Sequence, residues 1–162
     1  MNTILIAEDD DNDALLLKRA FQKGSSSVSL QRVSDGEEAI AYLRGEKPFH
    51  NRQTHPLPGL VVMDMRMPRK TGLEVLKWIR GNPTTHRLRV VMLTSSRQRL
   101  DIDHAYEIGA NSYLVKPANF DQLTAMVLSL QKYWFELSEK PELSYEQSVA
   151  RPMITPTLHA PL

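Results

Sequence analysis

The sequence predicts an α/β protein, a doubly wound three-layer sandwich in which helices cover both faces of a five-stranded parallel sheet. Two observations lead to this prediction. Short β-branched or apolar runs alternate with longer stretches whose apolar residues recur every three or four positions, a pattern typical of βα units. Five such units fit along the 162 residues, and the right-handed crossover rule leaves few ways to arrange them.

The first two units are expected within residues 3–44. A strand at residues 3–7 leads into a helix capped among Asp10–Asp13, because acidic side chains accept hydrogen bonds from the free amides of a first turn. The inward stripe of this helix is expected to be Leu15, Leu16, Ala20 and Phe21. A strand at residues 28–33, whose mixed polarity indicates a sheet edge, precedes a helix at residues 37–44 with inward Ala39, Ile40 and Leu43.

The other three units follow residues 45–59, where three prolines and several polar residues predict a surface loop. The run at residues 60–63 is the most apolar and is therefore expected in the middle of the sheet. Helices at 71–80 and 97–108 flank a strand at 90–93, and a fifth strand follows at 112–115. The last helix begins near Asn119 and has the most regular stripe: Phe120, Leu123, Val127, Leu130, Trp134 and Leu137.

Residues 1–140 are therefore expected to form one domain with an extended last helix, and residues 141–162 a flexible tail containing several prolines. Twenty basic and nineteen acidic side chains give a net charge of +1, which provides no global attraction to nucleic acid or to anionic lipid. The absence of cysteine excludes disulfides, zinc–thiolate sites and thiol catalysis. The apolar start ends at Glu8, too early for a signal peptide or a membrane span, so a cytoplasmic protein is expected.

Polar side chains follow four of the five predicted strands, where each strand ends. Glu8-Asp9 follows the first strand, Asp64 the third, Thr94-Ser95 the fourth and Lys116 the fifth. Functional groups of an open parallel sheet gather at the carboxyl ends of its strands, near the point where strand order reverses. These side chains are therefore expected to meet in one small cleft.

The charges of this cleft predict a metal-assisted phosphoacceptor. Three carboxylates, on Glu8, Asp9 and Asp64, would repel one another unless cations offset them. A divalent ion and Lys116 would bring the cleft near neutrality, and oxygen ligands with open positions favour Mg²⁺. One carboxylate then remains free to attack phosphorus, while cations stabilise the transferring oxygens.

These motifs resemble the receiver domain of two-component response regulators. Glu8-Asp9 resembles the acidic pair of the family, and Asp64, in the run Val61 to Pro68 with Gly72 after it, resembles the phosphoacceptor. Thr94 resembles the switch hydroxyl. Lys116 before Pro117 resembles the family's lysine, and Tyr113 its aromatic switch residue. The similarity covers residues 3–138, and five spaced motifs agree in order, which makes the resemblance specific.

The resemblance implies a flavodoxin-like (βα)5 sandwich with strand order 2-1-3-4-5. It implies Mg²⁺ held by Asp9, Asp64 and the backbone carbonyl of Arg66, with Glu8 contributing through water, and a cis peptide bond before Pro117. The long loop before the third strand and the aromatic end of the last helix are similar to stand-alone receivers that pair with bacterial phytochrome histidine kinases. Two residues after the acceptor, where the family commonly has a smaller side chain or an amide, this chain has Arg66. A guanidinium there could reach the phosphoryl group or restrict access of water, and so affect the lifetime of the phosphorylated state.

Several residues have a simpler structural interpretation. Asp10, Asp11 and Asp13 are better explained as helix caps and dipole partners than as ligands. Tyr113 suits core packing as well as switching. His50, His55 and His86 lie in predicted loops and are not spaced from other possible ligands as metal-binding residues usually are. No cofactor besides the metal is expected. Tyr133, Trp134 and Phe135 are expected at a docking or homodimer surface, together with the fourth helix, fifth strand and fifth helix.

The predicted function is that of a non-enzymatic response regulator that takes a phosphoryl group from a histidine kinase onto Asp64. A phosphatase of the haloacid dehalogenase type would need an acid two residues after the nucleophile, where this chain has Arg66. A phosphorylation-independent binding module would not need the full set of site residues. A nucleotide-binding flavodoxin-like protein would need a glycine-rich loop after the first strand, which this sequence lacks.

Overall fold

The structure is a computed structural model that describes residues 2–24 and 28–139. The predicted tail at residues 141–162 lies outside the described residues. None of the helices in the described part of the chain is both long enough and apolar enough to span a bilayer.

A five-stranded parallel sheet forms the middle layer, in the order β2-β1-β3-β4-β5. Its strands are β1 (Asn2–Ala7), β2 (Val28–Val33), β3 (Leu60–Met63), β4 (Val90–Thr94) and β5 (Ser112–Val115). The predicted fold class and strand order are confirmed. As expected, β2 is an edge strand and the wholly buried β3 lies at the centre.

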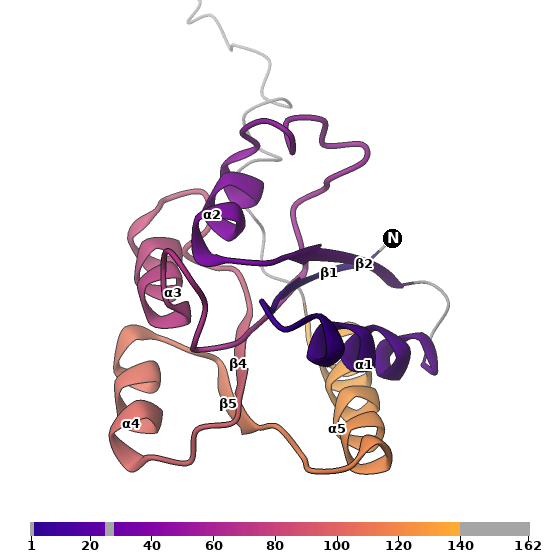
Figure 1. The fold of residues 1–162 in the computed structure, drawn as a ribbon. Helices are drawn as coiled ribbons and strands as arrows, with labels where there is room; N and C mark the ends of the chain where they lie inside the picture. Colours follow the sequence, from indigo (N-terminus) through magenta and orange to yellow (C-terminus); the bar gives the residue numbers. More distant parts are fainter. Residues whose placement is uncertain (1, 25–27, 140–162) are drawn as a thin grey trace, which may run out of the picture.

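Helices cover the two faces of the sheet. On one face lie α1 (Asp11–Gln22) and α5 (Phe120–Lys132), and on the other lie α2 (Gly36–Arg44), α3 (Gly72–Gly81) and α4 (Arg99–Ile108), as Figure 1 shows. Each helix except α4 begins with a side-chain cap, from Asp10, Asp35, Thr71 and Asn119. These caps satisfy first-turn amides that would otherwise have no partner, and they fix where each helix leaves the strand before it.

The predicted inward stripe of α1 was partly wrong. Ala20 and Phe21 are buried as expected, but the other two inward residues are Ala14 and Leu17, whereas Leu15 is 45% exposed and Leu16 36%. The run from Ala14 to Leu17 is apolar throughout, so more than one helical phase fits it. The packing of α1 on the sheet and beside α5 selects the phase in which residues 14, 17 and 21 face inward.

The loop at residues 45–59 contains no helix or strand, but it contributes to the core. Phe49 is buried against Tyr42, with ring centroids 5.1 Å apart. Arg52 donates to the carbonyl oxygens of Tyr42 at 2.8 Å and of Leu43 at 2.7 Å, and so satisfies the C-terminal end of α2. The prediction of a purely surface segment therefore missed an inward-facing hydrophobic anchor.

The last helix does not keep one regular period. After Lys132 the chain continues as a π-helical turn, η1 (Tyr133–Leu137), closed by the N–H of Ser138 donating to the carbonyl of Tyr133 at 2.8 Å. The wider turn shifts the stripe, so Leu137 is 67% exposed rather than inward. Trp134 and Phe135 pack instead against the core between the sheet, α1 and α5.

Candidate functional site

Backbone hydrogen bonds extend the sheet one residue beyond its strands and thereby place the site residues side by side. The N–H of Asp64 donates to the carbonyl of Ala7 at 2.9 Å, and the N–H of Lys116 donates to that of Thr94 at 2.9 Å. The N–H of Glu8 donates to the carbonyl of Val33 at 3.1 Å. The side chains that follow β1, β3 and β5 therefore leave the same edge of the sheet, beside Thr94 at the end of β4.

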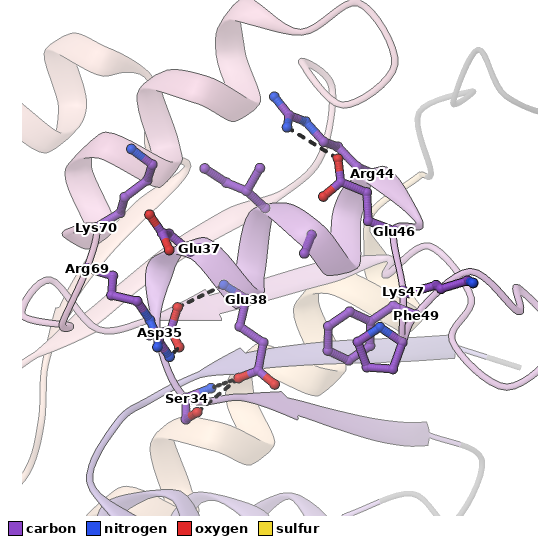
Figure 2. Close-up of a pocket in the computed structure, with 13 residues that line it drawn as sticks. Ser34, Asp35, Glu37, Glu38, Arg44, Glu46, Lys47, Phe49, Arg69 and Lys70 are labelled. Atoms are coloured by element: carbon purple, nitrogen blue, oxygen red, sulfur yellow. Dashed lines mark hydrogen bonds and ion pairs between the residues drawn. The ribbon is translucent and has the colours of Figure 1, made fainter.

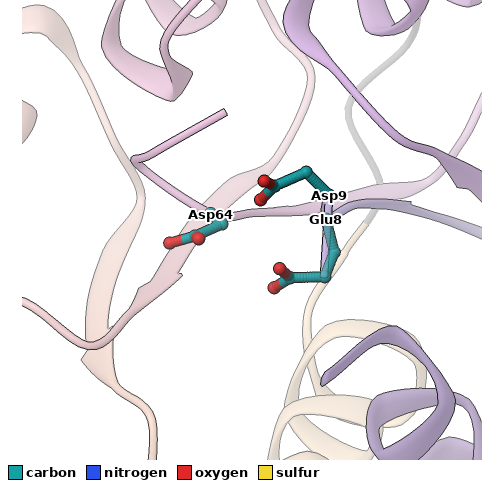
Figure 3. Close-up of side chains that lie close together, drawn as sticks. All are labelled: Glu8, Asp9 and Asp64. Atoms are coloured by element: carbon teal, nitrogen blue, oxygen red, sulfur yellow. The ribbon is translucent and has the colours of Figure 1, made fainter. Parts of the chain in front are cut away.

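Three carboxylates gather at this edge, as Figure 3 shows. One oxygen from each of Glu8, Asp9 and Asp64 lies within 4.8 Å of the others. Asp9 is exposed, Asp64 is partly buried and Glu8 is buried. Burial raises the pKa of Glu8, and the charge of Asp64 raises it further, although hydrogen bonding to Lys116 acts in the opposite direction. Such a cluster of oxygen donors is chemically suited to a hard divalent cation.

Lys116 balances part of this negative charge. Its Nζ lies 2.6 Å from Oε2 of Glu8 and 3.6 Å from Oδ2 of Asp64, with the side chain only 14% exposed. Burial acts to lower the pKa of this ammonium, but hydrogen bonds to Asp13 and Glu8 and the charge of Asp64 outweigh burial and raise it. The lysine is therefore a permanent cation at neutral pH.

Asp64 opens into a hollow of about 400 Å³ between the ends of β3 and β4. Its Oδ1 accepts a hydrogen bond from the N–H of Met65 at 2.7 Å. Thr94 is buried at the wall of this hollow, and Arg66, whose side chain is exposed, lines its rim with Arg97. The lining of the hollow thus includes a carboxylate, three hydroxyl-bearing residues and two guanidinium groups, a combination suited to an anion with several oxygens.

Tyr113 links this hollow to the surface of α4. Its hydroxyl donates to the carbonyl of Ser96 at 3.1 Å, and its backbone N–H donates to the hydroxyl of Tyr106 at 3.1 Å. Burial raises the pKa of Tyr113, so its hydroxyl keeps its proton and remains a donor. The ring therefore already contacts the loop between β4 and α4.

The loop that follows Asp64 is tied to the start of α2. Arg69 forms an ion pair with the buried Asp35, and the N–H of Gly36 approaches the carbonyl of Pro68 at 3.5 Å. Figure 2 shows the ion pair of Arg69 with Asp35 at one side of a hollow. The same hollow contains the ion pair of Arg44 with Glu46 and a hydrogen bond from the Ser34 hydroxyl to Glu38. The position of Arg66 thus depends on a loop held at two places.

Two expectations about individual residues change. Asp10 alone provides the N-terminal cap of α1, whereas Asp13 reaches into the site and binds Nζ of Lys116 at 2.8 Å. No sequence signal identified Asp13, because the rotation that turns it toward the strand ends is set by the packing of α1. The peptide bond before Pro117 is not cis; within the described residues the cis bond precedes Pro48. Prolyl bonds differ little in energy between isomers, so local contacts decide.

The fold and the carboxylate cluster together define a class of protein. The chain belongs to the response regulator receiver domain family, which matches residues 4–128, and it is a response regulator of two-component signalling. It is 34% identical over 138 residues to the probable methanogenesis regulatory protein FilR2 of Methanothrix harundinacea, covering 85% of this chain and 86% of that one. It is 33% identical to the response regulator Rcp1 of Synechocystis, covering 85% and 92%.

Several solved structures of phytochrome response regulators are similar to this chain. The phosphorylated cyanobacterial phytochrome response regulator RcpA has a TM-score of 0.81 at 34% identity, covering 87% of this chain and 99% of its own. RPA3017, which acts in red light signalling of R. palustris, has a TM-score of 0.82 at 38% identity, covering 88% and 99%. The Mn²⁺-bound form of Rcp1 has a TM-score of 0.79 at 32% identity, covering 88% and 100%.

Proposed function

We propose that this response regulator accepts a phosphoryl group on Asp64 in a Mg²⁺-dependent reaction. The observation that carries the proposal is the position of the Asp64 carboxylate, which lies between an acidic pair within 4.8 Å and a partly buried ammonium at 3.6 Å. A carboxylate held between a metal site and a lysine is a nucleophile whose product, a phosphoryl dianion, meets positive charge on both sides.

The residues of the site fit a hard divalent cation, since their donors are all oxygens. In the proposal Asp9, Asp64 and the backbone carbonyl of Arg66 would hold Mg²⁺, and Glu8 would contribute through water. The Mn²⁺-bound form of Rcp1 supports a divalent ion in a similar receiver. When bound, the ion would neutralise charge on the transferring phosphoryl oxygens.

The transfer step is a displacement at phosphorus. An oxygen of Asp64 forms the new O–P bond as the N–P bond of the donor's phosphohistidine breaks, and the electron pair of that bond stays on the imidazole. Lys116 and the hydroxyl of Thr94 then bind oxygens of the phosphoryl group. In this proposal the protein accepts and later loses its own phosphoryl group and turns over no other substrate.

The phosphoryl group is proposed to act through Thr94 and Tyr113. Movement of the Thr94 hydroxyl toward the phosphoryl group favours the inward position of Tyr113, whose hydroxyl already contacts Ser96. That change biases the surface formed by α4, β5 and α5, where Leu100 and Tyr106 are exposed. Phosphorylation thereby selects between two states of a surface that partners can distinguish.

The proposed partner is a sensor histidine kinase of the phytochrome type, working with this protein in the cytoplasm. The similarity to RcpA, RPA3017 and Rcp1 supports this choice. A homodimer through the α4, β5 and α5 face is also proposed. Of the three aromatic residues expected at that interface, Tyr133 is 54% exposed, while Trp134 and Phe135 are partly buried against the protein's own core. Tyr133 is therefore the aromatic side chain most available to a second copy.

The test is labelling by acetyl phosphate with Mg²⁺, followed by mass spectrometry. Wild type should gain one base-labile phosphoryl group, and Asp64→Asn should gain none. Labelled Asp64→Asn would contradict the assignment, and steady hydrolysis of a phosphate ester would favour a phosphatase. Phosphotransfer from a panel of kinases tests the partner: failure with phytochrome kinases and success with another class would overturn the pairing alone.

A further inference from the structure

Asp13 forms a contact that the proposed reaction does not use. Its Oδ2 lies 2.8 Å from Nζ of Lys116, nearly as close as Oε2 of Glu8 at 2.6 Å, whereas Oδ2 of Asp64 is 3.6 Å away. The first two distances are those of strong hydrogen bonds between charged groups, and the third is longer than a hydrogen bond. The lysine is thus held by two carboxylates, neither of which is the proposed phosphoacceptor.

The start of α1 fixes Asp13 in this position. Asp10 caps the helix by accepting the N–H of Asp13 at 2.9 Å, so the backbone of Asp13 is held in the first turn. The side chain of Asp13 is 42% exposed, and it contacts the ammonium of Lys116, whose side chain is 14% exposed. Asp13 therefore contributes its charge at the outer side of Lys116, away from the inner contact with Glu8.

A lysine ammonium has three N–H donors, and two of them are engaged here. Only one donor remains for Asp64 or for a phosphoryl group bound to it. The attraction of Asp13 also opposes any movement of the ammonium toward Asp64. Without that attraction, Lys116 would move closer to Asp64 and compete more strongly with a cation for the same carboxylate.

We infer that Asp13 is a positioning residue that holds Lys116 back from Asp64, which favours metal binding before phosphorylation and weakens the contact of the lysine with the phosphoryl group afterwards. The inference rests on the proposed function of Asp64 and Lys116. It predicts effects of opposite sign on two ligands of the same site. Loss of the Asp13 charge should weaken Mg²⁺ binding but strengthen binding of a phosphoryl mimic.

The test compares Asp13→Asn with Asp11→Asn, a matched control. Both residues are acids in the first turn of α1, so both changes remove one charge from the same helix end. Asp11 instead pairs with Arg32, at 2.7 Å, and its side chain is 90% exposed. Mg²⁺ affinity is measured by calorimetry, and beryllofluoride affinity by ¹⁹F NMR with each variant saturated with Mg²⁺.

For Asp13→Asn we expect Mg²⁺ binding to weaken roughly fivefold and beryllofluoride binding to tighten by a similar factor, the size of one exposed charge interaction at contact distance. Asp11→Asn should change both by less than about twofold, because its charge is screened by solvent. Asp13→Ser should repeat the opposite shifts with a different side chain, and Asp13→Glu, which keeps the charge, should restore wild-type values.

A purely structural role for Asp13 would lower both affinities together, and that result would overturn the inference. The inference would also be overturned if Asp13→Asn and Asp11→Asn bound Mg²⁺ and beryllofluoride with equal affinities. Either result leaves the proposed function intact if wild type still binds Mg²⁺ and is labelled at Asp64. Failure of the wild type to bind Mg²⁺ or to be labelled would instead contradict the proposed function.

Discussion

At the scale of single residues, Gly72 connects the fold to the site. A Cβ atom at this position would lie 2.2 Å from the carbonyl oxygen of Asp64 and 3.0 Å from Cα of Met65. Both contacts are with backbone, which cannot rotate away as a side chain can. We expect Gly72→Ala to lower the free energy of unfolding by about 2–3 kcal/mol, as overpacking of a buried site does. Urea unfolding followed by circular dichroism measures the change.

Gly81, the last residue of the same helix, is the control for this substitution. A Cβ there would meet nothing within 4 Å. Gly81→Ala should therefore leave stability unchanged or raise it by up to about 1 kcal/mol, because alanine is the better helix former. If the two variants had the same stability, the close approach of Gly72 to the backbone of Asp64 and Met65 would have no energetic consequence.

The positions of Asp64 and Lys116 could be predicted from sequence because parallel strands end at one edge. Any polar residue directly after an apolar strand is carried there by the next hydrogen bond of the ladder. The role of Asp13 could not be predicted in the same way. A residue in the first turn of a helix can cap the helix, contact solvent or face the site, depending on how the helix is rotated about its axis. Sequence spacing alone does not determine this rotation. The contact with Lys116 is fixed only once α1 packs on α5.

At the scale of elements, α2 and the loop after it depend on one buried phenol. Tyr42 is fully buried, and its hydroxyl donates to the carbonyl of Pro56 at 2.9 Å. Burial raises the pKa of Tyr42 to about 12, although the charge of Arg52 acts in the opposite direction. The unfolded chain has a tyrosine pKa of about 10. The folded state therefore keeps this proton to higher pH than the unfolded state does.

It follows that the contribution of Tyr42 to stability is complete below about pH 10 and is lost as the pH rises toward 12. Between pH 9 and pH 11 the loss should be about 1 kcal/mol. Tyr42→Phe should be less stable than wild type by about 1 kcal/mol at pH 7, because the Pro56 carbonyl loses its donor. By pH 11 the two proteins should have similar stability in urea titrations. A constant difference between pH 7 and pH 11 would contradict this account.

The same elements show where pattern reasoning succeeds and where it fails. The bounds of β2 and β5 were predicted to the residue, because residues that disfavour strands lie near the ends of both runs. Gly24 and Asp35 lie near the two ends of β2, and Asn111 and Lys116-Pro117 adjoin β5. The burial of Phe49 and the change to a π-helical turn after Lys132 were not predicted. Both depend on contacts between segments distant in sequence: Phe49 packs on Tyr42, and Arg89, at the foot of β4, donates to the carbonyl of Trp134 at 2.7 Å. Local periodicity contains no information on such contacts.

At the scale of the whole molecule, a net charge of +1 conceals an uneven distribution of charge. Four carboxylates gather at the carboxyl edge of the sheet. Those of Glu8, Asp13 and Asp64 lie within 3.6 Å of the Lys116 ammonium, and that of Asp9 lies beside Glu8 and Asp64. Their mutual repulsion opposes folding of the metal-free protein and disappears in the unfolded chain. The fold therefore holds the acids together at an energetic cost, and a bound cation would remove it.

The resulting expectation is that Mg²⁺ stabilises the entire domain. At free Mg²⁺ one hundred times its measured Kd, the free energy of unfolding should rise by about 2.7 kcal/mol. For a chain of this size, that corresponds to a rise of roughly 5–10 °C in Tm by calorimetry. Potassium chloride of equal ionic strength controls for general screening. Asp9→Asn, which removes one proposed ligand and one repelling charge, should be at least as stable as wild type in chelator, yet gain much less from Mg²⁺. An equal gain in that variant would mean that the ion stabilises the protein at some other place.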